Sequence, residues 1–375
     1  MEPVRLDPEQ AHCPRVGRRR RHGGLQLLTT DARKKRIALI GAGSISTIHL
    51  STLVESPHVE LVAIADVDLE RASRQAKAFG VPRAYGAVDA LFDEETLDAV
   101  DIALPHDQHV SIARHALDRG IDVICEKPLG TSTSEAWELI SLAHAEGRTI
   151  LVKSYQRAAE PLARLARLLH EGAVGTPYLA TALFASDRRS ALADPTDWHA
   201  DWQRCGGGVF IDSGYHLVDG FRMLFGEVKE VVAAYGGSTY RAPDKAEDHG
   251  TLLLTFAGKV IGSVTCTWLD TSQEFRTERR VFGDGGSLEL HETYARAVLR
   301  GFRSGRVFVE ETFDDAWPRA NAAAMDVMIE RLCAGGDAGA SAEEAVRTLR
   351  VLEAGYESSR RGCAVTVTTD HDDAV

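Results

Sequence analysis

The sequence predicts an α/β protein whose first half is a doubly wound parallel sheet with helices on both faces. From Arg36 to Arg157, short apolar runs alternate with segments of helical length, and such alternation builds parallel βαβ units. After Gly175, alternating apolar and polar residues are interrupted by turns such as "FAGKV" and "GDGG". That second pattern is typical of strands joined in hairpins.

Each element of the first half follows from its own stretch of sequence. Strands are expected where short apolar runs are bounded by turn residues: "RIALIGAG" (36–43), "VELVAIAD" (59–66), "AVDIALP" (99–105), "IDVICEKP" (121–128) and "TILVKSYQR" (149–157). Helices are expected between them, over 44–56, 69–80, 110–120 and 134–147. In the second half, strands are expected within 176–186, 228–237, 250–268 and 279–290.

The composition argues against several classes of protein. The chain of 375 residues carries a formal net charge of −12, whereas general binding to nucleic acid or anionic membranes needs a basic face. No apolar run approaches the length of a membrane span. Six cysteines are scattered without a C-x-x-C pair. We therefore expect reduced thiols, no metal site and a cytoplasmic location.

Residues 1–34 are expected to form a disordered N-terminal extension, because they are polar and rich in Arg, Pro and Gly. The basic cluster Arg18–Arg21 is followed by no adequate apolar core, so it does not look like part of a signal peptide. A targeting or nucleic-acid role for this cluster is the alternative interpretation.

A dinucleotide-binding turn is predicted directly after the first strand. Gly41 permits a tight turn, Gly43 lets a pyrophosphate approach the backbone, and Ser44 and Ile45 lead into the helix. Asp66 ends the second strand, where a carboxylate can bind the ribose 2′-hydroxyl and would repel a 2′-phosphate. We therefore expect NAD as the preferred cofactor and NADP as the alternative. Asp66 as a simple cap or turn residue is the competing interpretation.

Two further strand ends carry polar residues. "ALPHDQH" places Pro105, His106 and His109 after one strand, and "CEKP" places Glu126 and Lys127 after another. Ligands of open α/β sheets bind outside the carboxyl ends of the strands. We therefore expect these residues near the nicotinamide half of a cofactor. A surface Lys127 paired with Glu126 is the alternative.

The segment "GGGVFIDSGYHLVD" (206–219) places Asp212 and His216 four residues apart at the start of a predicted helix. A carboxylate and an imidazole on one helical face behind three glycines suggest an acid/base pair that faces a ligand. The plainer alternatives are a helix cap for Asp212 and a core histidine for His216. A metal site using His199, Asp201, Asp212 and His216 is a third, weaker interpretation.

Taken together, these motifs resemble the Gfo/Idh/MocA family of nicotinamide-dependent oxidoreductases. The resemblance rests on "GAGSI", Asp66, "LPHDQH", "EKPLG" and the 206–219 segment, and it extends from about Arg36 to Val367. It implies a Rossmann dinucleotide-binding domain over 35–156. It also implies a C-terminal α/β domain over 157–367 with a large, mostly antiparallel sheet. A homodimer or homotetramer is expected with it.

The resemblance assigns catalysis to Lys127, Asp212 and His216. It also places Arg157 and Trp198 beside the substrate, with Tyr155 and Asp187 as further candidates. The implied reaction interconverts a secondary alcohol and a ketone on a sugar, sugar derivative or cyclitol by hydride transfer to NAD(P). Two alternatives on the same fold remain open: a redox-neutral enzyme that retains NAD and cleaves glycosides, and a non-catalytic dinucleotide-binding sensor.

Overall fold

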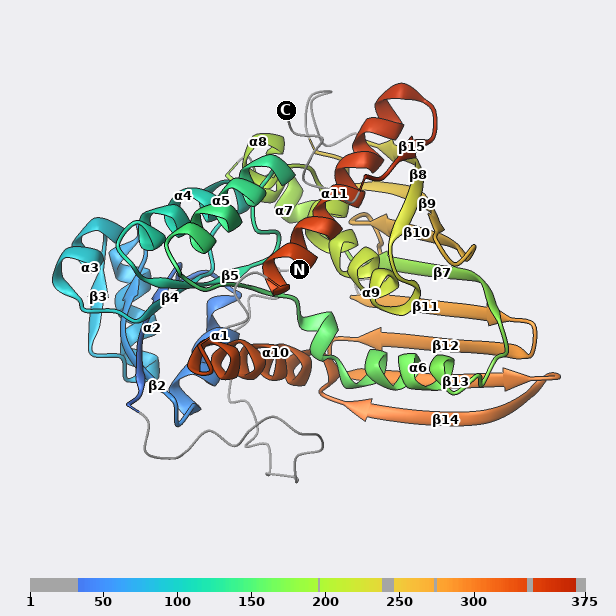
Figure 1. The fold of residues 1–375 in the computed structure, drawn as a ribbon, viewed down its shortest axis with the longest axis horizontal. Coiled ribbons are helices and arrows are strands. Elements are labelled where there is room, and N and C mark those ends of the chain that lie inside the picture. The colour runs from blue at the N-terminus through green and yellow to red at the C-terminus, as the bar shows by residue number, and fades with distance from the viewer. Residues whose placement is uncertain (1–32, 195, 238–245, 273–274, 336–339, 369–375) are drawn as a thin grey trace.

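The computed structural model describes residues 33–194, 196–237, 246–272, 275–335 and 340–368. Within them the chain forms two sheets that lie side by side, with two late helices running between them (Figure 1). Most of the predicted N-terminal extension and part of the loop around 236–248 lie outside the described residues. The predicted α/β class, with a parallel sheet followed by a mostly antiparallel one, is confirmed.

The first sheet is entirely parallel, with strand order β3-β2-β1-β4-β5-β6. Its strands are β1 (Lys35–Ile40), β2 (Val59–Ala65), β3 (Arg83–Tyr85), β4 (Ala99–Ile102), β5 (Asp122–Glu126) and β6 (Ile150–Lys153). The strand order reverses direction beside β1. In open α/β sheets a ligand binds at this reversal, outside the carboxyl ends of the strands.

Helices cover both faces of this sheet because alternate strand residues point to opposite sides. Ile37 and Leu39 of β1 pack toward α1 (Ser46–Glu55), α2 (Leu69–Phe79) and the late helix α10 (Ala316–Cys333). Ala38 and Ile40 pack toward the opposite face. That face carries α3 (Val88–Glu94), α4 (His106–Leu117) and α5 (Thr133–Ala145).

The second sheet has nine strands in the order β14-β13-β12-β11-β7-β10-β9-β8-β15. Only β7 and β10 pair in parallel. The strands are β7 (Pro177–Ala185), β8 (Val228–Gly236), β9 (His249–Phe256), β10 (Ile261–Thr267), β11 (Arg276–Gly283), β12 (Gly286–Thr293), β13 (Arg296–Arg303), β14 (Arg306–Asp314) and β15 (Val365–Thr366).

One face of this second sheet is covered by helices, and the connection between the sheets carries short helical segments. The covering helices include α6 (Glu160–His170), α9 (Tyr215–Phe225) and α11 (Ala340–Arg361) (Figure 1). The shorter elements are the 3-10 turns η1 (Tyr155–Ala158) and η2 (Trp198–Ala200), the helices α7 (Arg189–Ala193) and α8 (Trp202–Cys205), and the π-helical turn η3 (Phe210–Gly214).

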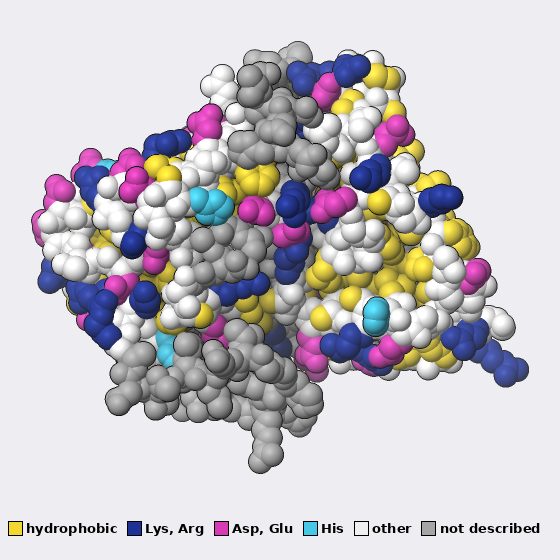
Figure 2. Space-filling view, in the orientation of Figure 1, with side chains coloured by type: hydrophobic (Ala, Val, Ile, Leu, Met, Phe, Trp, Pro, Cys, Tyr) yellow, Lys and Arg dark blue, Asp and Glu magenta, His cyan; other side chains and the backbone are white. Residues whose placement is uncertain are grey.

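Charged side chains of both signs are interspersed on the face of the molecule shown in Figure 2. No large basic surface is visible on that face, in agreement with the net charge of −12. Within the ranges that the structure describes, no helix is long and apolar enough to cross a membrane.

Candidate active site

The glycine-rich turn lies between β1 and α1, at the switch point of the parallel sheet. Gly41 has a φ of 104°, and a Cβ atom there would overlap the carbonyl oxygen of Ala103 at the end of β4. Gly41 is therefore required for close packing of two strand ends. Nothing lies within 4 Å of a Cβ placed on Gly43. The open space at Gly43 and the amino end of α1 suit a pyrophosphate, as the sequence predicts for Ser44 and Ile45 also.

Asp66 follows β2, beside this turn, and its carboxylate already has several donors. It accepts hydrogen bonds from the backbone N–H groups of Ala42 (2.7 Å) and Asp68 (2.8 Å), and from the Arg71 guanidinium at 2.5 and 3.2 Å. Burial alone would raise the pKa of Asp66, but the hydrogen bonds from Arg71 and the backbone outweigh it and lower the pKa. The sequence showed no arginine immediately after Asp66, yet Arg71 reaches it from the first turn of α2.

The two histidines after β4 hold the loops around the site. His106 is 3% exposed and places Nδ1 2.8 Å from the carbonyl oxygen of Cys205. Its ring meets the Trp198 ring in a T-shaped arrangement, with the centroids 4.7 Å apart. His109 is fully buried, with its ring nitrogens 2.7 and 2.8 Å from the carbonyl oxygens of Pro128 and Leu104. Pro105 is the N-cap residue of the helix that carries both. Their contact with a cofactor stays a prediction; their observed contacts are with the scaffold.

Lys127 and Asp212 come together although they lie 85 residues apart in the chain. The Lys127 ammonium donates to the Asp212 carboxylate at 3.0 Å and to the Asp212 carbonyl oxygen at 2.8 Å. Lys127 is 8% exposed, so it is not the surface lysine of the alternative interpretation. Its neighbour Glu126 is also buried, and the Glu126 carboxylate contacts His49 and Lys153.

Asp212 is held as a carboxylate by positive charge on two sides. Burial would raise its pKa, but Lys127, His199, Arg188 and His106 together hold the pKa well below its usual value. The Arg188 guanidinium lies 3.7 Å from the second carboxylate oxygen. Asp212 belongs to the π-helical turn η3, and no side-chain cap is formed at the start of α9. The simple capping role is therefore wrong, and π-helical turns occur frequently at functional sites.

His216 lies in the first turn of α9, and its described ring contacts are with residues other than Asp212. Its Nδ1 atom is buried and has no hydrogen-bond partner among the described residues, and none of the described hydrogen bonds joins it to Asp212. Its ring instead packs against Tyr155, with the centroids 4.5 Å apart. The pKa of His216 lies well below 6.5 because the ring is buried and because Lys127 is nearby. The unperturbed imidazole pKa of about 6.5, at which a histidine readily accepts and returns a proton at neutral pH, therefore does not hold for His216.

The predicted substrate residues fall into two groups. The ring of Trp198 stacks on that of His199, with the centroids 3.7 Å apart. His199 lies 3.2 Å from Arg188, the guanidinium that also approaches Asp212, so this segment borders the Asp212 side of the site. Asp187 is ion-paired with Arg189 at 2.7 Å. Tyr155 borders the His216 side.

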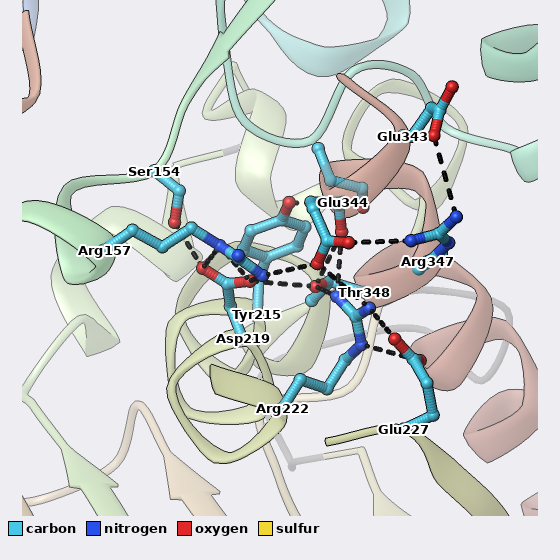
Figure 3. Close-up of polar contacts among 11 residues, drawn as sticks. Ser154, Arg157, Tyr215, Asp219, Arg222, Glu227, Glu343, Glu344, Arg347 and Thr348 are labelled. Atoms are coloured by element: carbon cyan, nitrogen blue, oxygen red, sulfur yellow. Dashed lines mark hydrogen bonds and ion pairs between the residues drawn. The ribbon is translucent and has the colours of Figure 1, made fainter. Parts of the chain in front are cut away.

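Arg157 lies in a separate ionic network (Figure 3). Its guanidinium bonds the Asp219 carboxylate at 2.7 and 3.0 Å and Glu344 at 3.0 Å, and Thr348 also bonds Asp219. These contacts join η1, α9 and α11 through charges that are already paired. A direct contact between Arg157 and substrate stays a prediction.

The triple glycine lies beside Glu247 and Tyr356. Gly206 and Gly207 have φ values of 79° and 156°, and a Cβ atom on Gly208 would overlap the carbonyl oxygen of Glu247. The glycines therefore allow the chain to pass close to Glu247 and to the Tyr356 hydroxyl, which lies 3.4 Å from the Gly208 nitrogen.

The metal-site alternative is not assembled. Asp201 caps α8 through the backbone N–H of Gln203 at 2.9 Å. Among the described residues, no group of three or more His, Cys, Asp or Glu side chains is placed to hold a metal ion. His199 and Asp212 take part instead in the charge cluster around Arg188.

Models of known families match both halves of the chain. Residues 35–154 match the oxidoreductase family with an NAD-binding Rossmann fold, and residues 162–289 match the GFO/IDH/MocA C-terminal domain. The chain belongs to the Gfo/Idh/MocA family. It is therefore an oxidoreductase with an NAD(P)-binding Rossmann domain, as the sequence predicts.

Similar proteins are dehydrogenases. The chain is 30% identical to D-apiose dehydrogenase of Paraburkholderia graminis over 348 residues, which covers 90% of this chain and 91% of the other. It is 30% identical to D-xylose 1-dehydrogenase (NADP(+)) 2 of Haloferax volcanii, with 87% and 98% covered. Its fold is similar to that of levoglucosan dehydrogenase in complex with NADH and levoglucosan, at a TM-score of 0.78 and 21% identity, with 89% and 100% covered.

Proposed function

We propose that this oxidoreductase converts a secondary alcohol of a sugar, sugar derivative or cyclitol to a ketone, and reduces the ketone in the reverse direction. The proposal rests on the Lys127–Asp212 ion pair, in which nitrogen and oxygen are 3.0 Å apart. The pair lies at the carboxyl end of β5, and Lys127 is buried there. Hydrogen-bonding groups of this kind suit a polyhydroxylated substrate. The dehydrogenases of D-apiose and D-xylose among the similar proteins support the same class.

The residues of the site fit the cofactor that the family implies. Gly43 leaves room for a pyrophosphate, and the Asp66 carboxylate beside the glycine-rich turn is available in kind to bind a ribose hydroxyl. The chemistry that a bound nicotinamide ring supplies is acceptance of a hydride from the substrate carbon. The protein must therefore handle the hydroxyl proton and the negative charge that develops on oxygen.

Lys127 stabilises that developing charge. An ammonium group within a water-poor site lowers the energy of an alkoxide far more than it would in bulk water. The Asp212 carboxylate, held ionised by Lys127 and Arg188, keeps the lysine in place and accepts a hydrogen bond from a neighbouring hydroxyl.

His216 receives the proton. The lowered pKa keeps its ring neutral at neutral pH, and a neutral imidazole has one nitrogen able to accept a proton. The same low pKa means that the imidazolium, once formed, releases the proton readily. The unpartnered Nδ1 supports this assignment, because buried polar atoms are rarely left unpaired without a reason.

We propose that NAD is preferred and that NADP is also accepted. The Asp66 carboxylate favours the free ribose hydroxyls of NAD. Arg71 has 42% of its side chain exposed and can turn from Asp66 toward a 2′-phosphate. The NADP(+) named in the similar D-xylose dehydrogenase supports this second possibility.

We further propose that two copies pair through the uncovered face of the second sheet. Val232, Leu253 and Ile261 point away from the helices and are 41%, 48% and 52% exposed, and Val232 and Leu253 are direct cross-strand neighbours. An open apolar sheet face is normally covered in the working assembly.

The five cysteines within the described ranges are unbridged, which supports a reducing, cytoplasmic setting.

Substitution of Lys127 tests the proposed chemistry. Lys127→Met keeps most of the side-chain volume and removes the charge, and kcat should fall by at least about 100-fold, in the range of a lost charge-stabilising group. Lys77→Met, at the end of α2, is the matched control and should retain full turnover. Cofactor binding, followed by nicotinamide fluorescence, should persist in both variants. Equal kcat in the Lys127 and Lys77 variants would remove the proposed role.

A further inference from the structure

A cluster of buried charged side chains adjoins Glu126, the residue before Lys127, and its other members have no role in the proposed reaction. His49 of α1 places Nδ1 2.7 Å from Asp101 of β4 and Nε2 2.9 Å from Glu126 of β5. Lys153 of β6 donates to the same Glu126 oxygen at 2.8 Å and to Asn321 of α10 at 2.8 Å. His49 and Asp101 are fully buried, and Lys153 is 2% exposed.

With both carboxyl groups ionised, the two contacts of His49 favour the doubly protonated ring. A neutral imidazole has a single N–H donor, so one of its nitrogens would face a carboxylate oxygen lone pair to lone pair. An imidazolium donates to both carboxylates. Burial alone would lower the pKa of His49 and Lys153 also lowers it, but Asp101 and Glu126 outweigh them and the pKa is raised. Two cations and two carboxylates then form a neutral cluster, the arrangement in which buried charges are tolerated.

The cluster reaches the catalytic lysine through Glu126. The other Glu126 oxygen accepts the backbone N–H of Lys127 at 3.1 Å, while the Lys127 ammonium extends to Asp212. His49 and Lys153 together hold the Glu126 pKa well below its usual value against the effect of burial. Glu126 is therefore fixed on one side by two cations and fixes the backbone of Lys127 on the other.

We propose that His49 is a positioning residue: as an imidazolium it clamps Glu126 between α1 and β5 and so sets the place of Lys127 for hydride transfer. The proposal rests on the proposed function for its effect on turnover, but the charge state of His49 can be tested without it. Asp101 serves as the second anchor of the ring, and Lys153 as the second cation on Glu126. Because Lys153 also bonds Asn321, the clamp ties the late helix α10 to the same loop.

Replacement of His49 by a neutral residue measures the effect of the clamp. His49→Gln keeps one donor but removes the charge, and kcat should fall about 10- to 100-fold, the scale of a small misplacement of a catalytic group. The KM for NAD should change less than about threefold, because the glycine-rich turn is untouched. His58→Gln, just beyond the same helix, is the matched control and should behave as wild type. Unchanged kcat in folded His49→Gln would overturn the proposal.

Two readouts separate positioning from a general structural role. Without the His49 charge, Glu126 binds a proton more easily. In the dependence of kcat on pH, the pH below which kcat falls should therefore be higher in His49→Gln than in wild type. If His49 acts through Glu126, the double variant with Glu126→Gln should be no slower than Glu126→Gln alone. An unchanged pH for this fall in kcat, or multiplied losses in the double variant, would contradict the mechanism.

The charge of His49 is measured directly by nitrogen NMR of histidine-labelled wild-type protein, with the signal assigned through its loss in His49→Gln or, if that variant does not fold, in His49→Asn. We expect both ring nitrogens of His49 to carry protons at neutral pH. A single protonated nitrogen would overturn the proposal whether or not the enzyme is active. Absence of any turnover in wild type, with both nitrogens protonated, would instead count against the proposed function alone.

Discussion

The carboxyl group of Glu247 should make the stability of this protein depend on pH in an unusual direction. Glu247 is 5% exposed and lies behind the triple glycine. One carboxyl oxygen accepts hydrogen bonds from the Phe210 backbone N–H and the Tyr356 hydroxyl, both at 2.9 Å. The other is buried with no partner among the described residues. Burial raises the pKa of Glu247 to about 7 from the ordinary 4.5.

The sign and size of the effect follow from this difference. Between the two pKa values the folded protein holds a proton that the unfolded chain has lost, so the free energy of unfolding falls as pH rises through this window. Each pKa unit corresponds to about 1.4 kcal/mol, so the carboxyl group destabilises the fold by about 3 kcal/mol above its folded pKa. Below the unfolded value this penalty is absent.

Comparison with a variant that does not titrate isolates this contribution from the other ionisable groups. The quantity to follow is the unfolding free energy of Glu247→Gln minus that of wild type. We expect this difference to increase by about 3 kcal/mol from about pH 4 to about pH 8. Urea unfolding followed by tryptophan fluorescence measures it. Glu60→Gln, at a half-exposed position of β2, is the control and should give a flat difference. A flat difference for Glu247→Gln as well would refute the reasoning.

Three further predictions concern the cofactor, the loop and the assembly. Arg71→Ala should lower kcat/KM for NADP about tenfold and leave that for NAD little changed; equal losses with both cofactors would show that Arg71 only supports Asp66. Gly208→Ala should lower the unfolding free energy by about 1–3 kcal/mol because its Cβ would overlap the Glu247 carbonyl. Gly258→Ala, where nothing lies within 4 Å of a Cβ, should cost far less, and equal shifts in the melting temperature would contradict the close approach. Leu253→Glu should dissociate the assembly in sedimentation velocity, and an unchanged sedimentation coefficient would place the interface elsewhere.

Much of the parallel sheet could be predicted because its strands are buried on both faces and appear as continuous apolar runs. The exception is β3, since the three residues of Arg83–Tyr85 are too few for any period to be recognised. The π-helical turn at Asp212 also escaped prediction. Its residues look like an ordinary helix start. The family resemblance groups Asp212 with Lys127, but neither the pattern nor the resemblance indicates the π-helical geometry.

The partners of charged residues could be predicted only where they are local. Arg71 could have been found: Asp68 caps α2, and a side chain in the first helical turn points back toward the strand end that carries Asp66. Arg188 and Glu247 gave no such signal. The contact of Arg188 with Asp212, and that of Glu247 with the triple-glycine segment, are both set by the packing of segments distant in sequence. His49 looked like one residue among many in a predicted helix, and only the fold places two carboxylates on its ring.

The most direct test of the proposed function is the nicotinamide absorbance of purified enzyme with NAD and, separately, NADP, against D-apiose, D-xylose, levoglucosan and inositols. We predict that at least one ring polyol reduces NAD, more efficiently than NADP. If NAD stays bound but none of these polyols reduces it, and none of their ketone derivatives oxidises NADH, the dehydrogenase is contradicted. That result would favour the redox-neutral or sensor interpretation.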